Sequence, residues 1–356
     1  MSKLFGHLTL NDTDYVFQAT AGQRAIYEAV AEYVARGNTE LNSQMSTLVA
    51  ETTTDHTRRF YLPGSGYLQE IGPDGRPSAV KAAGSWDVSF PLVIKGDQSV
   101  GNRTAMAHMT AGALAKHVDT VIADNFNSVR RDILERLFND GAGAAITMTD
   151  DEWGNLSVQP LANGDATLYP PVIGSMTEAV EDHYLAAGYL TAAIADGATD
   201  PFVVLVPELT DHFGYGANCI TWMNRASATV VRALTNFNPV TDPRLTNAVT
   251  AQVPISVPAG VPGTVIGYHS AGTWVAIWDY IPADYMLSIC LDVEAPLVKR
   301  VDRAGLSPDL TMVIEDDEYP FRASFWEHRY GFGCGNRLNG AVMYFTAGAY
   351  AVPTIV

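Results

Sequence analysis

The chain has 356 residues, of which 47% are hydrophobic and 17% charged, so it can bury a sizeable core as one large domain or about two smaller ones. Lys and Arg number 22 against 39 Asp and Glu, which gives a formal net charge of −17. Nucleic-acid binders and polybasic membrane-surface proteins depend on clustered positive charge, so this balance argues against both classes.

Membrane insertion and cysteine chemistry are also not expected. No apolar stretch approaches the roughly 20 residues that span a bilayer, and the N-terminal segment lacks the pattern of a secretory signal. The three cysteines are Cys219, Cys290 and Cys334. Their odd number and the lack of a CxxC spacing argue against a disulfide framework and a cysteine-built zinc site, and favour a reducing interior.

The N-terminal part is predicted to hold one short helix and a polar arm. Residues 22–36 place their apolar side chains on one face, and Gly37 suits the position after a helix end. Residues 38–57 are rich in Thr, Ser and Asn. They carry few core residues, so we expect this arm to lie against another surface.

A long two-stranded hairpin is predicted next. Residues 59–71 and 78–94 read as strands, the second with alternating apolar and polar residues. The intervening sequence Gly-Pro-Asp-Gly-Arg-Pro at 72–77 is a strong turn signal. An isolated ribbon of two strands is marginal in water, so it must rest on a partner unless it folds back on its own domain.

Residues 103–138 are predicted to form a long helix, because apolar residues recur at steps of three and four until the glycine-containing segment 140–143. At about 1.5 Å per residue such a helix is roughly 50 Å long. Only one stripe of it is apolar, so we expect a spine that crosses a domain.

The remaining chain is predicted to alternate strands and helices. In chain order these are a small β element (151–160), a helix opened by the capping box Ser175 and Glu178 (175–195), a buried strand ended by Pro207 (202–206), a helix (221–234), strands and loops (236–296), and two closing strands (321–329 and 340–345) that pair across a glycine-rich turn (331–335).

This order of elements resembles the major capsid protein of tailed bacteriophages, which has the α+β Hong Kong 97-type fold. The resemblance includes the closing sequences EHRYGFG at 327–333 and RLNGAV at 337–342. It implies an N-terminal arm with a short helix (1–57), an extended hairpin loop (58–102), a spine helix with the first part of a peripheral domain (103–200), an axial domain (201–305) and the closing strands of the peripheral domain (306–356).

The resemblance implies a structural protein rather than an enzyme. It would self-assemble as hexamers and pentamers into an icosahedral head shell that encloses double-stranded DNA without binding it specifically, and without a membrane. The expected partner is a portal, and separate scaffolding or decoration proteins stay open. Since the arm begins almost at Met1, the resemblance implies either a separate scaffolding protein or none. We expect synthesis in the host bacterial cytoplasm and a final place in the virion.

Two alternatives remain at this point. The first is an encapsulin-like nanocompartment shell that encloses protein cargo. The second is a hydrolytic enzyme that uses Cys334 or a pair of carboxylates, and it predicts a compact monomer or dimer with a concave pocket. Particle size separates the enzyme from either shell.

Each candidate for chemistry has a simpler structural explanation, so no catalytic, cofactor-binding or metal-binding residue is assigned. The candidates are the glycine-rich segment 331–335, which lacks Walker spacing; Cys334 with His328, which lack a third orienting group; the acidic runs 150–152 and 315–318, which read as solvated loops; His108 with His117, whose spacing does not suit one metal; and Trp274 with Trp278, which read as core residues.

The predicted hairpin has balanced charge, and we expect its cations to dock on acidic patches of a neighbouring subunit. The proposed intersubunit contacts are Arg58, Arg59, Arg76, Lys81 and Lys95. The acidic balance of the whole chain suits a wall along which packaged DNA can slide.

Some relatives of the resembled family crosslink a loop lysine to a neighbour's asparagine with the help of a catalytic glutamate. Lys81 or Lys95 and Asn336 or Asn339 match the positions of the first two groups. No glutamate follows Glu327, so the base that would deprotonate the lysine is missing from that region. We therefore expect no such crosslink.

Overall fold

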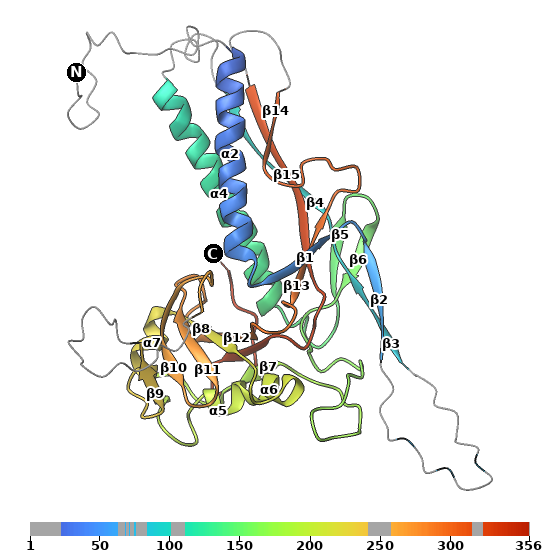
Figure 1. The fold of residues 1–356 in the computed structure, drawn as a ribbon, viewed down its shortest axis with the longest axis vertical. Helices are drawn as coiled ribbons and strands as arrows, with labels where there is room; N and C mark the ends of the chain where they lie inside the picture. Colours follow the sequence, from blue (N-terminus) through green and yellow to red (C-terminus); the bar gives the residue numbers. More distant parts are fainter. Residues whose placement is uncertain are drawn as a thin grey trace. The chain divides into compact units, whose positions relative to one another are not determined.

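The computed structural model describes residues 23–62, 84–100, 111–240, 258–314 and 323–355, together with the single residues Leu68, Ile71 and Gly75. It is an α+β chain (Figure 1) whose residues divide into two compact units. The first unit comprises Met1–Asn42, Val93–Arg130 and Asp302–Tyr330, and the second comprises Ser43–Leu92, Arg131–Val301 and Gly331–Val356.

The first unit packs two long helices on an antiparallel sheet. Helices α2 (Gln23–Met45) and α4 (Ala111–Phe138) begin in this unit and end in the second. Strand β15 (Ala323–Cys334) pairs with β4 (Val93–Val100) and with β14 (Thr311–Ile314). The core consists of Val34, Val118, Val121, Leu310 and Trp326, so the sheet is covered by the apolar stripes of both helices.

The spine helix is confirmed over Ala111–Phe138, while residues 103–110 lie outside the described residues. The end predicted for the first helix is wrong, because α2 runs through Gly37 to Met45. A Cβ atom at Gly37 would lie 3.2 Å from Cγ2 of Ile122. Gly37 therefore serves the close approach of α2 to α4 and does not end the helix.

The second unit is built on a seven-stranded sheet in the order β7-β16-β12-β8-β11-β10-β9. The strands are β7 (Tyr184–Ala186), β8 (Cys219–Met223), β9 (Phe237–Pro239), β10 (Thr264–His269), β11 (Thr273–Ile277), β12 (Tyr285–Cys290) and β16 (Ala341–Tyr344). Every residue of the central strand β8 is buried.

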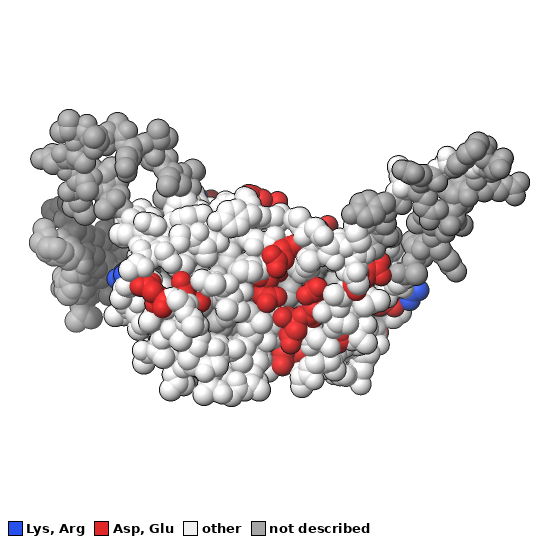
Figure 2. Space-filling model, turned by 90° about the horizontal axis from the view of Figure 1, so that it is seen from below, with Lys and Arg blue, Asp and Glu red and all other residues white. Residues whose placement is uncertain are grey.

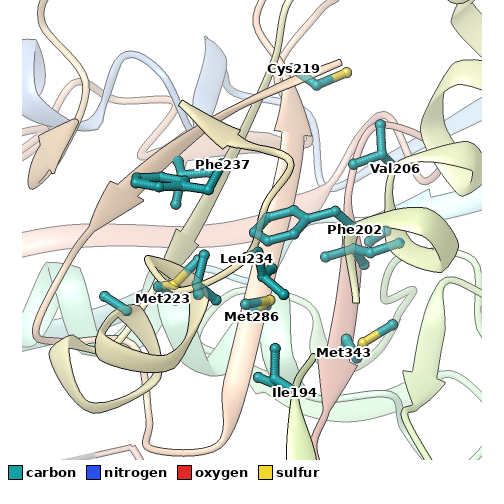
Figure 3. Packing of buried hydrophobic residues seen from close by; sticks show 14 of the residues in the cluster. Ile194, Phe202, Val206, Cys219, Met223, Leu234, Phe237, Met286 and Met343 are labelled. Carbon is teal, nitrogen blue, oxygen red and sulfur yellow. The ribbon is translucent and has the colours of Figure 1, made fainter. Parts of the chain in front are cut away.

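Short helices cover this sheet, and Figure 3 shows the core between them. They are α5 (Phe202–Leu205), α6 (Pro207–Phe213) and α7 (Arg225–Val231). Phe202 lies in one buried cluster with Met286 and Met343 of the sheet. Asn224 caps α7 by accepting a hydrogen bond from the Ala226 N–H, which explains why the chain leaves β8 and turns helical there.

Several predicted elements of the second unit are wrong. Residues 175–195 form β7 and a 3-10 turn (Thr191–Ala193) instead of a helix. Residues 202–206 are helical, and the predicted helix 221–234 is a strand followed by α7. The glycine-rich segment lies mainly in β15, and residues 341–344 pair with β12 and β7 instead of with residues 321–329.

Three further strand pairings involve residues of the second unit. The predicted polar arm contains β1 (Val49–Thr53), which pairs in parallel with β13 (Leu297–Val301), and both belong to the five-stranded sheet of order β1-β13-β15-β14. The predicted hairpin is confirmed at its base, where β2 (Thr57–Tyr61) pairs with β3 (Ser85–Ser89). The predicted β element near residue 151 is a hairpin of β5 (Ile146–Asp150) and β6 (Gly154–Val158). The predicted turn at 72–77 lies mostly outside the described residues.

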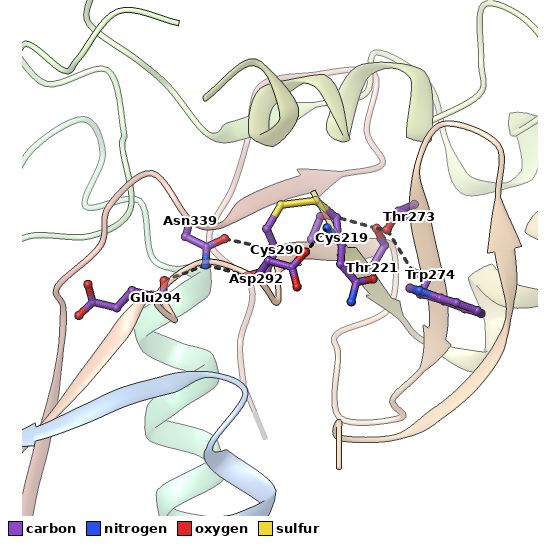
Figure 4. The surroundings of a disulfide bond; sticks show 10 residues. Cys219, Thr221, Thr273, Trp274, Cys290, Asp292, Glu294 and Asn339 are labelled. Atoms are coloured by element: carbon purple, nitrogen blue, oxygen red, sulfur yellow. Dashed lines mark hydrogen bonds between the residues drawn. A yellow bond between two sulfur atoms is a disulfide. The ribbon is translucent and has the colours of Figure 1, made fainter. Parts of the chain in front are cut away.

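Cys219 and Cys290 form a disulfide, so the prediction against disulfides is wrong for this pair. The two residues lie directly opposite each other in the antiparallel pair β8 and β12 (Figure 4). Asn339 braces the same strand end, because its side chain accepts a hydrogen bond from the Cys290 N–H at 2.9 Å and donates one to the Cys290 carbonyl at 3.0 Å. Cys334 is a free, buried thiol.

In the described parts of the chain, no helix has an apolar stretch long enough for a membrane span.

Removing the disulfide is expected to destabilise the second unit. Its two cysteines are 71 positions apart. Closing a loop of that size lowers the conformational entropy of the unfolded chain, which raises the free energy of the unfolded state by about 4 kcal/mol. We expect the double variant Cys219→Ala/Cys290→Ala to lose about that free energy of unfolding in denaturant titrations. Cys334→Ala is the matched control for replacing a buried cysteine. An unfolding midpoint that is equal in the double variant and the parent chain would contradict the stabilising role.

Candidate functional site

The most unusual surface is the ribbon, defined here as β2, β3 and the described residues between them, which are Leu62, Leu68, Ile71, Gly75 and Gly84. β2 and β3 form a two-stranded sheet of their own among the described strands. Phe60 and Trp86 stack at its base with ring centroids 5.9 Å apart. Further along, Tyr61 is 73% exposed, Ile71 is 60% exposed and Leu68 is fully exposed. The ribbon therefore presents apolar side chains to solvent, which is typical of surfaces that bind another molecule.

Two predicted contact residues, Arg58 and Arg59, lie on β2 and have carboxylate partners in their own chain. The Arg58 guanidinium is hydrogen-bonded to Glu51 and, at 3.1 Å, to Asp55. Arg59 donates to both oxygens of Asp87 at 2.6 and 2.7 Å. These bonds raise the pKa of both arginines and lower the pKa of the Asp87 carboxyl. Docking of these cations on a neighbour stays a prediction, and it requires the internal pairs to be shared or exchanged.

The other predicted contact residues are not on the described part of the ribbon. Lys95 lies on β4 with its ammonium 5.4 Å from the centroid of the Tyr330 ring. Arg76 and Lys81 lie outside the described residues. Of the two asparagines considered for crosslinking, Asn336 and Asn339 both donate to the Glu294 carbonyl, at 3.1 and 2.8 Å. Their amide nitrogens are therefore engaged within the chain.

The predicted enzymatic candidates are held in structural roles. Burial raises the pKa of the Cys334 thiol to about 12, so its nucleophilic thiolate is scarce at neutral pH. His328 is buried, and its Nδ1 lies 2.8 Å from Asn125 Oδ1. Trp274 and Trp278 are buried, which confirms the core interpretation.

Of the acidic and metal-binding candidates, some lie among the described residues and others do not. Asp150 was expected in a solvated loop, but its carboxylate is buried against Arg300, so that prediction is wrong. The second acidic run, 315–318, and His108 lie outside the described residues. Within the described ranges, no group of three or more His, Cys, Asp or Glu side chains is arranged to hold a metal ion.

The second unit also carries an acidic cluster that sequence reasoning missed, formed by Glu181, Asp182, Glu208 and Asp211. Partial burial, together with the other three carboxylates, raises the pKa of Glu208 to about 7. The cluster is spread over two chain segments, so no single run in the sequence signals it. On the face of the molecule drawn in Figure 2, acidic side chains gather in clusters and Lys and Arg appear only near the edges.

The acidic cluster makes stability depend on pH. The folded pKa of Glu208 lies above its ordinary value of 4.5, so its contribution to stability is complete below about pH 4.5 and is lost as the pH rises through about 7. We expect Glu208→Gln to raise the free energy of unfolding by about 1 kcal/mol near pH 8 and to leave it unchanged near pH 4.5. The gain is modest because the Glu208 carboxyl is partly exposed to solvent. Thermal unfolding across this range measures the effect. Glu32→Gln, at an exposed helix position, is the control, and an equal gain in both variants would contradict this assignment.

Comparisons with known proteins give structural neighbours only. No sequence family and no curated protein matches the chain. The fold is similar to that of a chain from Mycobacterium phage Patience, which is 20% identical with a TM-score of 0.68, over 99% of this chain and 96% of that one.

Two capsid chains are more distant. A chain from the capsid of cyanophage P-SCSP1u is 10% identical over 84% of this chain and 86% of its own, with a TM-score of 0.49. A chain from the capsid asymmetric unit of cyanophage A-1(L) is 13% identical over 86% and 94%, with a TM-score of 0.48. The chain thus shares its fold with a protein of a bacteriophage along nearly the whole of both chains, as the resemblance found in the sequence predicts.

Proposed function

We propose that this chain is a major capsid protein, which assembles with copies of itself into the icosahedral head shell around a double-stranded DNA phage genome. The observation that carries the proposal is the ribbon, whose apolar side chains Tyr61, Leu68 and Ile71 lie in solvent. The fold shared with a phage protein along nearly the whole chain supports the same conclusion.

The physical basis is burial against a neighbouring copy. Each large apolar side chain that leaves solvent contributes about 1.5–3 kcal/mol, so three of them make a modest contact. A closed shell repeats that contact in every subunit, and the sum is large although no single contact is strong. In this proposal the role of the chain is structural, and no residue acts as a catalyst.

The proposal extends to arrangement and partners. Hexamers and pentamers of this chain would form the shell, with a portal and separate scaffolding or decoration proteins as further partners. The five parts expected from the resemblance, from the arm at 1–57 to the closing strands at 306–356, would supply its arm, hairpin loop, peripheral and axial domains. The chain would be made in the host bacterial cytoplasm and end in the virion. The formal charge of −17 supports a wall that does not hold DNA tightly.

Particle formation tests the function directly. We expect the expressed chain to elute from a size-exclusion column as very large particles that appear as closed shells in negative stain. Leu68→Glu with Ile71→Glu should shift the chain to free subunits, because ionised side chains on the ribbon oppose burial. Leu190→Glu is the matched control, since Leu190 is 62% exposed in the second unit but is not on the ribbon. A parent chain that stays a monomer or dimer would contradict the proposal and favour a compact enzyme.

The ribbon cations call for a separate test, because Arg59 already pairs with Asp87. Arg59→Asp reverses the charge on the ribbon, and Arg59→Asp with Asp87→Arg restores the internal pair in the opposite direction. If Arg59 also meets an acidic patch on a neighbour, both variants should lose particle yield, since the partner's charge is unchanged. Full recovery in the double variant would show that Arg59 serves only its own ribbon. Arg58→Glu is expected to reduce particle yield as well.

A further inference from the structure

The ribbon is joined to the second unit through a buried ionic contact at its root, defined here as residues 89–92. Arg300 on β13 is 2% exposed, and its Nη1 donates to the Phe90 carbonyl at 2.8 Å and to Asp150 Oδ2 at 2.6 Å. One guanidinium thus bonds the ribbon root and the β5–β6 hairpin simultaneously. Because the guanidinium is planar, it constrains the angle between the two groups as well as their separation.

Asp150 completes the contact from the other side. The same Oδ2 accepts a hydrogen bond from the Leu92 N–H at 2.7 Å, while Oδ1 accepts from the N–H groups of Glu152 and Trp153 at 2.9 and 2.7 Å. The Asp151 N–H also donates to the Leu92 carbonyl at 3.1 Å. The root is therefore bonded on both sides of Pro91.

Two glycines of β15 form the surface on which the root lies. A Cβ atom at Gly331 would lie 1.8 Å from the Pro91 carbonyl oxygen, and one at Gly333 would lie 2.7 Å from that of Ser89. The two positions are two residues apart in a strand, so they share one face. Only glycine lets the backbone of the root approach this closely, which gives Gly331 and Gly333 of the glycine-rich segment a structural reason.

This arrangement specifies geometry more than it adds stability. A buried ion pair loses in desolvation much of what it gains in attraction, so an apolar replacement of equal size would often be as stable. Among the described strands, β2 and β3 pair only with each other, so strand pairing alone does not set the direction of the ribbon. The fixed geometry of the hydrogen bonds from Arg300 at the root constrains that direction.

We propose that Arg300, Asp150, Gly331 and Gly333 are positioning residues that fix the direction of the ribbon relative to the second unit and thereby the uniformity of the assembled particle. The second half of this statement rests on the proposed function. A closed shell of hexamers and pentamers allows only a few discrete geometries for each contact between copies, so a ribbon that varies freely in direction gives mixed or open assemblies.

The direct test measures ribbon direction in the full chain. Spin labels at Leu68→Cys and Tyr215→Cys, both exposed positions of the second unit, report one distance by pulsed electron resonance. Labelled chain is diluted into unlabelled chain, so that only pairs within one molecule are measured. The buried Cys334 stays unlabelled in the folded chain.

Arg300→Lys and Gly333→Ala are expected to shift or broaden this distance while the far-ultraviolet spectrum stays unchanged. Lysine keeps the charge but is one bond shorter and lacks the planar group that fixes the angle between the two acceptors, and the added methyl group displaces the root. The matched controls are Arg337→Lys and Gly216→Ala. Arg337 is equally buried but donates to Pro160 and Asn163, and a Cβ at Gly216 would have no atom within 4 Å.

A narrow, unshifted distance in both root variants, or the same broadening in the controls, would overturn the positioning role. If the native chain forms no particles, the proposed function fails while the distance measurement still decides the positioning role. If particles form, we expect the root variants to yield a broader range of diameters in negative stain than the controls. Uniform particles from a chain with a broadened distance would overturn the link between root and shell.

Discussion

Two paired strands cannot bury their own side chains, and most of what distinguishes this chain follows from that constraint. β2 and β3 pair only with each other among the described strands, and Tyr61 and Leu68 are left in solvent. Such a ribbon depends on what its root is bonded to and on what its surface meets. Within the second unit, Arg300 and the glycine face of β15 hold the root of the ribbon. We infer that another copy of the chain covers its exposed surface.

Four arginines hold separate segments of the chain together through hydrogen bonds and ion pairs. Arg300 and Arg337 are buried and donate to backbone carbonyls and carboxylates from segments far apart in the chain. Their planar forks hold side-chain and backbone acceptors from several chain segments in a fixed relative geometry. Arg58 and Arg59 are paired on the ribbon. The formal net charge of −17 is consistent with the proposed function, in which the shell wall does not bind DNA tightly.

Sequence reasoning succeeded where a pattern is long and local. The three- and four-residue spacing identified α4, and alternation with a strong turn signal identified the base of the ribbon. It failed where a short apolar run fits a strand and a helix equally well. Residues 202–206 are continuously apolar, yet α5 buries Phe202 and Leu205 and leaves Val203 and Val204 exposed. A strand and a covering helix share that composition, and only the neighbouring sheet decides between them.

The sequence by itself determined the long helix, the base of the two-stranded ribbon and the acidic character of the chain, because these depend on periodicity and composition. The fold class followed from the resemblance in the order of elements. The tertiary structure alone decided the disulfide, the partners of the ribbon arginines, the burial of Asp150 and the reason for Gly331 and Gly333. Each of these depends on which distant strands become neighbours and in which register. A shift of one residue in β12 against β8 would separate Cys290 from Cys219, and no local pattern encodes that choice.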